Sequence, residues 1–365
     1  MPYVDAPKIE ISVEGSQPKI LIVTSQSEDE VVKALSERAI SDLVGSGVLE
    51  TNIDVIKVDA PEEIAQVTID ALIKTRKIVV AGENERLYKN VDFEFGYDAA
   101  LCIGYLLEEE ISDFDQKSAQ VYDDVQNIIL ETQVPCIMGI LTCRDYEQAL
   151  ERAGIGRIVQ GMNHGHFWAV AALAEIQVRK MISEGKSDTT LLKQLVIPDS
   201  SRQENKSKLN IAILCCQWNM EVNSEIVIKA VLDLVENGYD INRIKIYSAV
   251  GSFELSGLAN YLIQTSRKMV MEERPKEDWI SAVICIGSLI KGGTKHFKLI
   301  FDSVESAFDR ISQETKTACI SGVLCCNSIE EAKYSAGIMS DDGVPGKNIG
   351  SELVINMIKR LDELK

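Results

Sequence analysis

The chain has 365 residues, with 38 Lys and Arg against 56 Asp and Glu, and a formal net charge of −18. Hydrophobic residues make up 45% and charged residues 26%, which excludes a disordered chain, a collagen and a coiled coil. The length predicts two domains, each large enough for its own core. The acidic balance disfavours general nucleic-acid binding, but it leaves room for a local basic pocket that takes a small phosphorylated substrate.

No window reaches the roughly 18 unbroken apolar residues of a membrane span. The first residues, MPYVDAPKIEISVEG, lack the basic start and apolar core of a secretory signal. We therefore expect a cytoplasmic protein with nine reduced cysteines and no membrane partner. No cysteine pair has CxxC spacing, so neither a metal site nor a redox motif is predicted.

The chain contains an internal repeat. Residues 138–154 (MGILTCRDYEQALERAG) match residues 321–337 (SGVLCCNSIEEAKYSAG), and residues 102–104 match 285–287. Both matches have the same offset of 183 residues. Such a constant offset indicates a tandem duplication.

Both halves alternate short apolar runs with helical patterns. In the first half we predict strands at 20–24, 53–58, 99–106 and 135–141, and helices at 29–44, 62–74, 116–132, 144–153 and 166–183. In the second half we predict strands at 209–215, 244–249, 282–286 and 317–324, and helices at 222–237, 255–265, 296–313, 328–336 and 351–364. This alternation predicts two α/β domains with parallel four-stranded sheets, each covered by helices on both faces.

The predicted organisation is repeat 1 at residues 1–183, a linker at 184–208 and repeat 2 at 209–365. The linker has Gly, Ser, Asp, Asn and Pro among its residues. Residues 80–95 of repeat 1 are longer than their counterpart near 271–279.

The second half resembles the lumazine synthase (6,7-dimethyl-8-ribityllumazine synthase) family. The matching motifs follow successive predicted strands: QWN at 217–219, GSFE at 251–254 and IGSLIKGGTKHF at 286–297. The first half resembles the same family through GILT, EQALERAG and NHG at 163–165. The resemblance covers nearly the whole chain apart from the leader and the linker. It implies a flavodoxin-like fold, with no metal and no redox cofactor.

Trp218 follows a strand at the carboxyl edge of a parallel sheet, where ligands bind in open α/β folds. An indole there can stack on a planar heterocycle, although an isolated Trp is more often part of a core. In the family, this aromatic residue stacks on the pyrimidine substrate. The resemblance adds Asn219 beside it.

Ser252, Phe253 and Glu254 lie in a turn that opens a helix. Backbone N–H groups of such a turn can bind hydroxyls, and a first-turn acid also stabilises the helix, so the two interpretations are compatible. In the family, this turn lies against the ribityl chain of the substrate.

Gly292, Gly293 and Thr294 precede a helix that begins near His296. Glycines and helix N-terminal amides can bind a phosphate, although a Gly-Gly pair is more often only a turn. In the family, this loop binds the phosphate of the four-carbon substrate, and the histidine is the proposed general acid/base. Without that context a capping or surface histidine is the better interpretation. The resemblance also assigns substrate contacts to Ser288, Leu289 and Ile290.

The family's site lies between two subunits. One supplies the motifs above, here called the front half-site. The other supplies a back half-site, with a phosphate-binding arginine and often a lysine. In repeat 2 these two positions hold Ser335 and Ile349. Lys333 or Lys347 could replace the arginine, but an ammonium binds phosphate less specifically than a guanidinium.

Repeat 1 shows the reverse pattern. Residues 108–111 (EEEI) replace the Gly-Gly loop, Asp113 replaces the histidine, and Ser27 replaces the aromatic residue. Three glutamates would repel phosphate. The back half-site is kept, through Met138, Arg152 and His164.

We therefore expect a composite site between the front of repeat 2 and the back of a neighbouring repeat 1. The expected partners are ribitylaminouracil, butanone phosphate and further copies of the chain. The family forms rings of five, which cannot alternate two repeats. Either the ring has an even number of repeats, or each repeat forms its own ring.

Two other functions stay open. One is a catalytically inactive structural or assembly protein, favoured by the losses in both repeats. The other is a related riboflavin synthase or flavin-binding protein. The KGGTKHF run favours the phosphate-using synthase over the latter.

Overall fold

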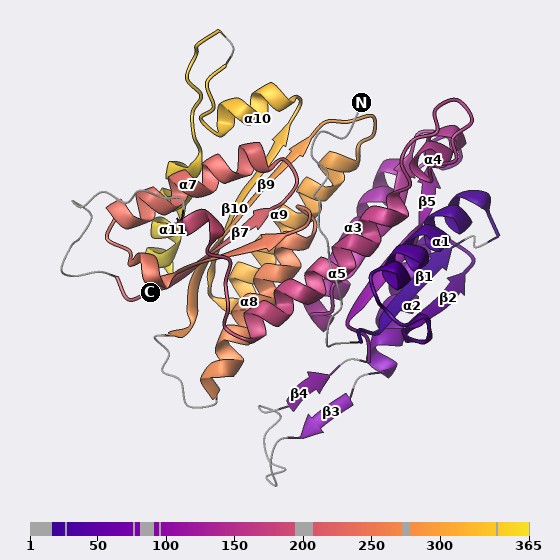
Figure 1. The fold of residues 1–365 in the computed structure, drawn as a ribbon, viewed down its shortest axis with the longest axis horizontal. Helices are drawn as coiled ribbons and strands as arrows, with labels where there is room; N and C mark the ends of the chain where they lie inside the picture. The colour runs from indigo at the N-terminus through magenta and orange to yellow at the C-terminus, as the bar shows by residue number, and fades with distance from the viewer. Residues whose placement is uncertain are drawn as a thin grey trace. The chain divides into compact units, whose positions relative to one another are not determined.

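The computed structural model describes residues 17–25, 28–75, 77–80, 91–94, 96–193, 207–271, 278–340 and 342–364. They form two compact units, divided between Ile176 and Gln177 within helix α5 (His164–Ser183) (Figure 1). Ser27 and the greater part of the leader and of the linker lie outside the described residues.

Repeat 1 contains a parallel sheet with the strand order β2-β1-β5-β6. The strands are β1 (Ile20–Ser25), β2 (Ile53–Val58), β5 (Ala99–Leu107) and β6 (Cys136–Cys143). Every residue of β1, β5 and β6 is buried, as expected for a sheet covered on both faces.

The helices of repeat 1 cover both faces because right-handed crossovers change direction at β1. Helix α1 (Glu30–Gly45) lies on one face, where Gly165 of α5 packs against its backbone. Helices α2 (Ile64–Lys74) and α3 (Phe114–Thr132) pack together on the other face. The short helix α4 (Tyr146–Arg152) follows β6.

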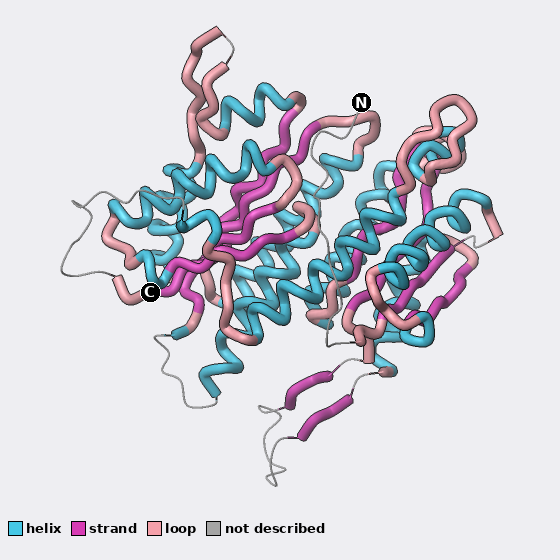
Figure 2. Tube along the Cα trace, in the orientation of Figure 1, coloured by secondary structure: helices cyan, strands magenta, loops and turns pink. Residues whose placement is uncertain are grey.

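Repeat 2 has the same topology, with the strand order β8-β7-β9-β10. Figure 2 draws the strands of both repeats in magenta among the cyan helices. The strands are β7 (Asn210–Cys216), β8 (Ile244–Ala249), β9 (Ile280–Ile290) and β10 (Ala318–Cys326). The helices are α7 (Met220–Glu236), α8 (Glu254–Met271), α9 (His296–Thr315), α10 (Ile329–Ser335) and α11 (Gly350–Glu363). Helices α7 and α11 pack together, and so do α8 and α9.

The strand pairing gives the difference in residue number between equivalent positions of the two repeats. Ile20 lies opposite Ile53 in repeat 1, and Ile211 lies opposite Ile244 in repeat 2, so these positions differ by 191 residues. After the longer segment of repeat 1 the offset is 183, since Ile20 also pairs with Ala99 and Ile211 with Ala282. These two offsets define equivalent positions below.

The prediction of two tandem α/β domains with parallel four-stranded sheets is confirmed. Two boundaries were clearly wrong: helix α8 runs to Met271 rather than to residue 265, and the third strand of repeat 2 runs to Ile290 rather than to residue 286. The extension pairs with β10 as far as Cys326, and this tertiary pairing overrides the break that Gly287 suggests.

The segment at 80–95 contains strand β4 (Val91–Glu94), which pairs antiparallel with β3 (Lys77–Val80). Residues 81–90 between them lie outside the described residues. The linker contacts repeat 2 at both ends, through the bridges Asp188 to Ile246 and Ser207 to Tyr239. A short helix, α6 (Thr190–Lys193), lies between these bridges. Among the described helices, none combines the length and apolar character that crossing a bilayer requires.

Candidate functional site

The loop after β7 is fixed to the end of β9 by two asparagines. Asn219 has left-handed backbone angles, φ 57° and ψ 43°, and its Nδ2 donates to the Ser288 carbonyl at 3.0 Å. Asn223 Nδ2 donates to the carbonyls of Cys216 at 2.9 Å and Trp218 at 2.7 Å. The half-buried Trp218 is therefore held at the carboxyl edge of the sheet.

Asn223 was not among the predicted site residues. It is fully buried in α7, where it lies between apolar neighbours such as Val222 and Ile226. The sequence does mark Asn223 as a single amide on an apolar face of the helix. Buried polar groups need hydrogen-bond partners, so such an amide is expected to bond a neighbouring segment.

The GSFE turn packs tightly against the third strand. A Cβ on Gly251 would lie 2.5 Å from Glu254 Oε2, and one on Gly287 would lie 2.6 Å from Ser252 Oγ. Ser252 and Phe253 are buried. The thiol of Cys216, a weak hydrogen-bonding group, lies beside the Ser252 hydroxyl, and burial raises the pKa of this thiol to about 12.

The Gly-Gly loop begins where β9 ends. Its Gly292 and Gly293 are exposed, and a Cβ added to Gly292 would meet no atom within 4 Å. Packing therefore does not require Gly292, and the space beside its backbone is open. Helix α9 begins at His296 as predicted, and its first N–H donates to Thr294 Oγ1 at 3.4 Å. The loop thus lies at the positive end of a 20-residue helix.

The back of repeat 2 holds no arginine, and its lysines pair with carboxylates. The Ser335 hydroxyl donates to the Glu331 carbonyl of its own helix at 3.0 Å. Lys333 Nζ lies 2.8 Å from Glu221, and Lys347 Nζ lies 2.5 Å from Glu352. Both lysines that could replace the missing arginine therefore form ion pairs with carboxylates of repeat 2.

The back of repeat 1 places Arg152 at the last turn of α4. This helix begins at a capping box, since Asp145 Oδ1 accepts from the Gln148 N–H and Gln148 Oε1 accepts from the Arg144 N–H, both at 2.8 Å. Burial raises the pKa of the Cys143 thiol to about 12, and the nearby charge of Arg152 opposes that shift. Arg152 thus ends a short helix that packs against strand β6.

Met138 and His164 lie at the same end of repeat 1. Met138 is buried in β6, and the neighbouring Gly139 leaves room for the Trp168 ring at 3.1 Å from a built Cβ. The His164 ring packs edge-on against Trp168, with centroids 6.2 Å apart. Trp168 therefore packs against His164 and against β6, the strand that carries Met138.

An Asn-x-Gly motif holds the back of both repeats. Asn163 Oδ1 accepts from the Gly165 N–H at 2.9 Å, and its Nδ2 donates to the Ala34 carbonyl of α1 at 2.9 Å. In repeat 2, Asn348 makes the equivalent bonds to Gly350 at 2.8 Å and to a carbonyl of α7 at 3.0 Å. The shared motif is structural, because it attaches the last long helix to the first one.

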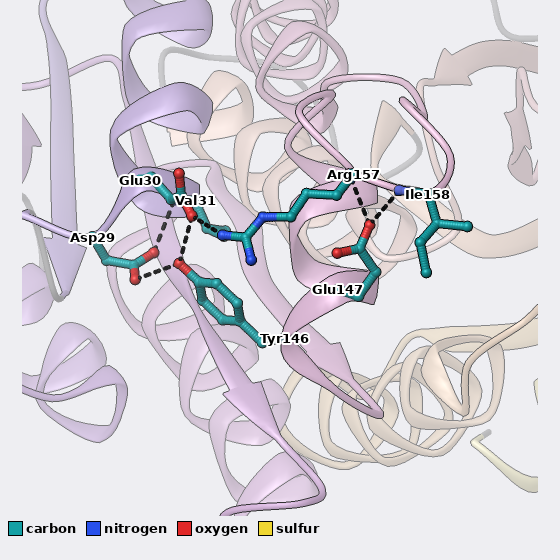
Figure 3. A network of polar contacts seen from close by, with 7 residues as sticks. All are labelled: Asp29, Glu30, Val31, Tyr146, Glu147, Arg157 and Ile158. Carbon is teal, nitrogen blue, oxygen red and sulfur yellow. Dashed lines mark hydrogen bonds and ion pairs between the residues drawn. The ribbon is translucent and has the colours of Figure 1, made fainter.

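In repeat 1, aromatic and acidic side chains fill the strand ends. Tyr105 is equivalent to Ser288, is largely buried, and packs edge-on against Tyr146 at 6.1 Å. The Tyr146 hydroxyl donates to Asp29 Oδ2 at 2.9 Å (Figure 3). Glu109 Oε1 accepts from the Tyr146 N–H at 3.0 Å. Burial and the Asp29 charge raise the pKa of both tyrosines, so both hydroxyls stay protonated donors.

The same network fixes the loop that follows Arg152. Glu147 Oε1 accepts from the backbone N–H groups of Arg157 at 2.6 Å and Ile158 at 2.8 Å (Figure 3). The Arg157 guanidinium donates to Glu30 at 2.8 Å. Sequence reasoning missed these residues, since no single motif marks them.

The chain folds into two doubly wound α/β domains, and the candidate site residues of repeat 2 lie at the carboxyl edge of its sheet. The sequence profile of the 6,7-dimethyl-8-ribityllumazine synthase family matches residues 17–180 and again residues 208–365. The chain therefore belongs to this family and carries its domain twice.

A 6,7-dimethyl-8-ribityllumazine synthase of Pediococcus pentosaceus is 28% identical over 158 residues, which cover 43% of this chain and 90% of that protein. Among solved structures, an L-Trp-bound ABC domain from Streptococcus pneumonia is 10% identical, with a TM-score of 0.21 over 95% of this chain and 85% of the other. A myo-inositol-bound ABC transporter solute binding protein from Bacillus halodurans is 11% identical, with a TM-score of 0.21 over 95% and 91%. These structural scores are too low to carry an argument.

Proposed function

We propose that the chain condenses 5-amino-6-ribitylaminouracil with 3,4-dihydroxy-2-butanone 4-phosphate to 6,7-dimethyl-8-ribityllumazine, a step of riboflavin biosynthesis. The observation that carries the proposal is the retention, in a family member, of the aromatic residue, the turn, the Gly-Gly loop and the histidine of repeat 2. They follow successive strands of one parallel sheet, at the edge where ligands bind in such folds. All nine cysteines are free thiols, which fits a reducing compartment, so we assign the reaction to the cytoplasm.

Each group has a distinct role in the proposed reaction. Trp218 stacks on the pyrimidine ring, and the turn at Ser252 binds hydroxyls of the ribityl chain. The Thr294 loop and the start of α9 bind the phosphate. His296 moves protons as the substrate amine and ketone form an imine and as phosphate leaves. Catalysis is mainly positioning of two substrates.

We further propose that the phosphate-binding arginine is Arg152 of a neighbouring repeat 1. The support is complementary loss: repeat 2 lacks the arginine, and its Lys333 and Lys347 pair with carboxylates of the same repeat. A phosphate bound at repeat 2 would therefore receive a bidentate guanidinium contact from Arg152 of another repeat.

The test is a turnover assay of the purified oligomer with both substrates, followed by lumazine fluorescence. The parent chain should turn over, and His296→Ala should lower kcat by at least about a hundredfold, the usual contribution of a general acid/base. His166→Ala is the matched control, because His166 bonds Asp42 on α1 at 2.8 Å, in repeat 1. Equal rates in parent and His296→Ala would contradict the proposal.

The second candidate is a catalytically inactive member that keeps the fold and its assembly. It is favoured by Ser335, whose hydroxyl is bonded into its own helix rather than presented to a ligand. A folded parent chain that shows no turnover but still binds the lumazine product would support this candidate.

A further inference from the structure

Helix α4, which carries Arg152, is fixed to helix α1 at its first residue. The Tyr146 hydroxyl lies 2.9 Å from Asp29 Oδ2 and 3.4 Å from Glu30 Oε1, both at the start of α1 (Figure 3). The Tyr146 N–H donates to Glu109 Oε1 at 3.0 Å. Because a helix of seven residues is too short to be stable alone, such contacts determine where α4 lies.

The loop after Arg152 is fixed to the same helix. Glu147 Oε1 accepts from the backbone N–H groups of Arg157 and of the next residue, so the loop returns to the first turn of α4. At the last turn, a Cβ added to Gly161 would lie 1.9 Å from the Glu151 carbonyl oxygen, so the loop backbone packs directly on the helix. The arginine, which follows Glu151, is therefore supported from both ends of α4.

The equivalent helix of repeat 2, α10, lacks the hydroxyl–carboxylate contact. Ile329 and Met220 stand at the positions of the tyrosine and the aspartate, and neither side chain can form such a bond. An ion pair between Lys333 and Glu221, at 2.8 Å, connects α10 to α7 instead. Helix α10 carries Ser335 at the arginine position, so the tyrosine contact occurs in the repeat that keeps the arginine.

The contacts around α4 come from positions at which repeat 1 has lost the front half-site. Glu109 stands at the position of Gly292 in the Gly-Gly loop. Tyr105 stands at the position of Ser288 and packs edge-on against Tyr146, with ring centroids 6.1 Å apart. The same substitutions therefore remove a phosphate loop and support α4.

We propose that Tyr146 is a positioning residue for Arg152, so that the former front half-site of repeat 1 now serves the phosphate site of a neighbouring repeat 2. The inference rests on the proposed function, in which Arg152 binds the substrate phosphate. A guanidinium forms two parallel hydrogen bonds to phosphate oxygens only in a narrow geometry, and a displacement of about 1 Å weakens such a contact. Glu147 supports the same helix through the loop.

A double-mutant cycle on the purified oligomer tests this role, with the Kd for inorganic phosphate measured by isothermal titration calorimetry. Tyr146→Phe should raise this Kd by about fivefold or more, and it should have no further effect when Arg152 is already Ala. Tyr97→Phe is the matched control, because the Tyr97 hydroxyl also donates to a carboxylate, Asp54 Oδ2 at 2.7 Å, and it should change the Kd by less than about twofold. Equal effects of Tyr146→Phe with and without Arg152, or of the two phenylalanine variants, would overturn the proposal.

Glu147 gives a second test, because two variants remove the same charge. Glu147→Gln keeps the Oε1 acceptor, whereas Glu147→Ala loses it. Amide exchange at Arg157 and Ile158 should be about tenfold or more faster in the alanine variant and unchanged in the glutamine variant. The Kd for phosphate should also be higher in the alanine variant, an order that the loss of charge alone cannot produce. Equal Kd values in these two variants would overturn the role of the loop.

Turnover measured on the same samples separates this inference from the proposed reaction. If the parent chain binds phosphate and the cycle shows the expected coupling while no lumazine forms, the proposed reaction fails and the positioning role is supported. If the parent chain binds no phosphate, the positioning role is overturned.

Discussion

The Ser288 hydroxyl donates a hydrogen bond of 2.5 Å to Asn223 Oδ1, and this contact joins the end of strand β9 to helix α7. The amide of the same asparagine donates to the carbonyls of Cys216 and Trp218. One buried side chain therefore connects three segments that meet at the candidate site. The position of Trp218 depends on the interior of α7 as well as on its own loop.

Replacing this asparagine should destabilise repeat 2. Asn223→Leu removes the acceptor of the Ser288 hydroxyl and the donor of two buried carbonyls, so the free energy of unfolding should fall by about 2–4 kcal/mol. Urea denaturation measures the loss. Ser224→Ala is the control, because that hydroxyl donates to the Met220 carbonyl of its own helix and joins no other segment among the described residues, so the change should stay below about 1 kcal/mol. Similar losses in both variants would contradict this account of Asn223.

Arg152 should act on the phosphate-bearing substrate. Losing a charge-assisted contact costs about 1.5–3 kcal/mol, so Arg152→Ala should raise the KM for butanone phosphate by roughly ten- to a hundredfold, with little change in the KM for ribitylaminouracil. Steady-state kinetics with each substrate varied in turn measures this. Arg144→Ala is the control, since Arg144 is exposed and pairs with Asp145 at 3.1 Å. An unchanged KM in Arg152→Ala would exclude the composite site.

Local structure beside the candidate site could be predicted from the sequence and long-range contacts could not, while the roles of the site residues stay predictions. The start of α9 at His296 could be predicted, because a Gly-Gly loop before an amphipathic run marks a helix start. The end of β9 could not, because pairing with β10 to Cys326 is a long-range contact. Tyr105 was missed for the same reason: nothing beside it in the sequence shows that Tyr146 and Asp29 meet it at the strand ends.

Ser335→Arg distinguishes two arrangements: a site shared between repeat 2 and a neighbouring repeat 1, and a site within a ring formed by repeat 2 alone. If the site uses Arg152 of a neighbouring repeat 1, Ser335→Arg should leave the KM for butanone phosphate within about twofold of the parent. If repeat 2 forms its own ring, the new guanidinium would reach a phosphate, and the KM would fall by about tenfold or more. The equivalent position of repeat 1 carries Arg152 at the end of α4, so the half-buried position of Ser335 should accept an arginine and the variant should fold. Titration of butanone phosphate at saturating ribitylaminouracil measures the difference, and a tenfold fall would refute the composite arrangement.

The stability of repeat 2 should depend on the ionisation of Glu305. Burial raises the pKa of this half-buried carboxyl above 4.5, the Ser321 hydroxyl bond partly opposes that shift, and the Asp309 charge adds to it. The folded state therefore binds the proton more tightly than the unfolded state, and stability falls as the pH rises from 4.5 through the folded-state pKa.

Glu305→Gln keeps an acceptor for Ser321 but carries no charge. It should match the parent near pH 4 and exceed its free energy of unfolding near pH 7. Urea midpoints across that range test this. Glu314→Gln, on the same helix but exposed and paired with Arg310, should show no such gain, and a Glu305→Gln curve parallel to that of the parent would refute the assignment.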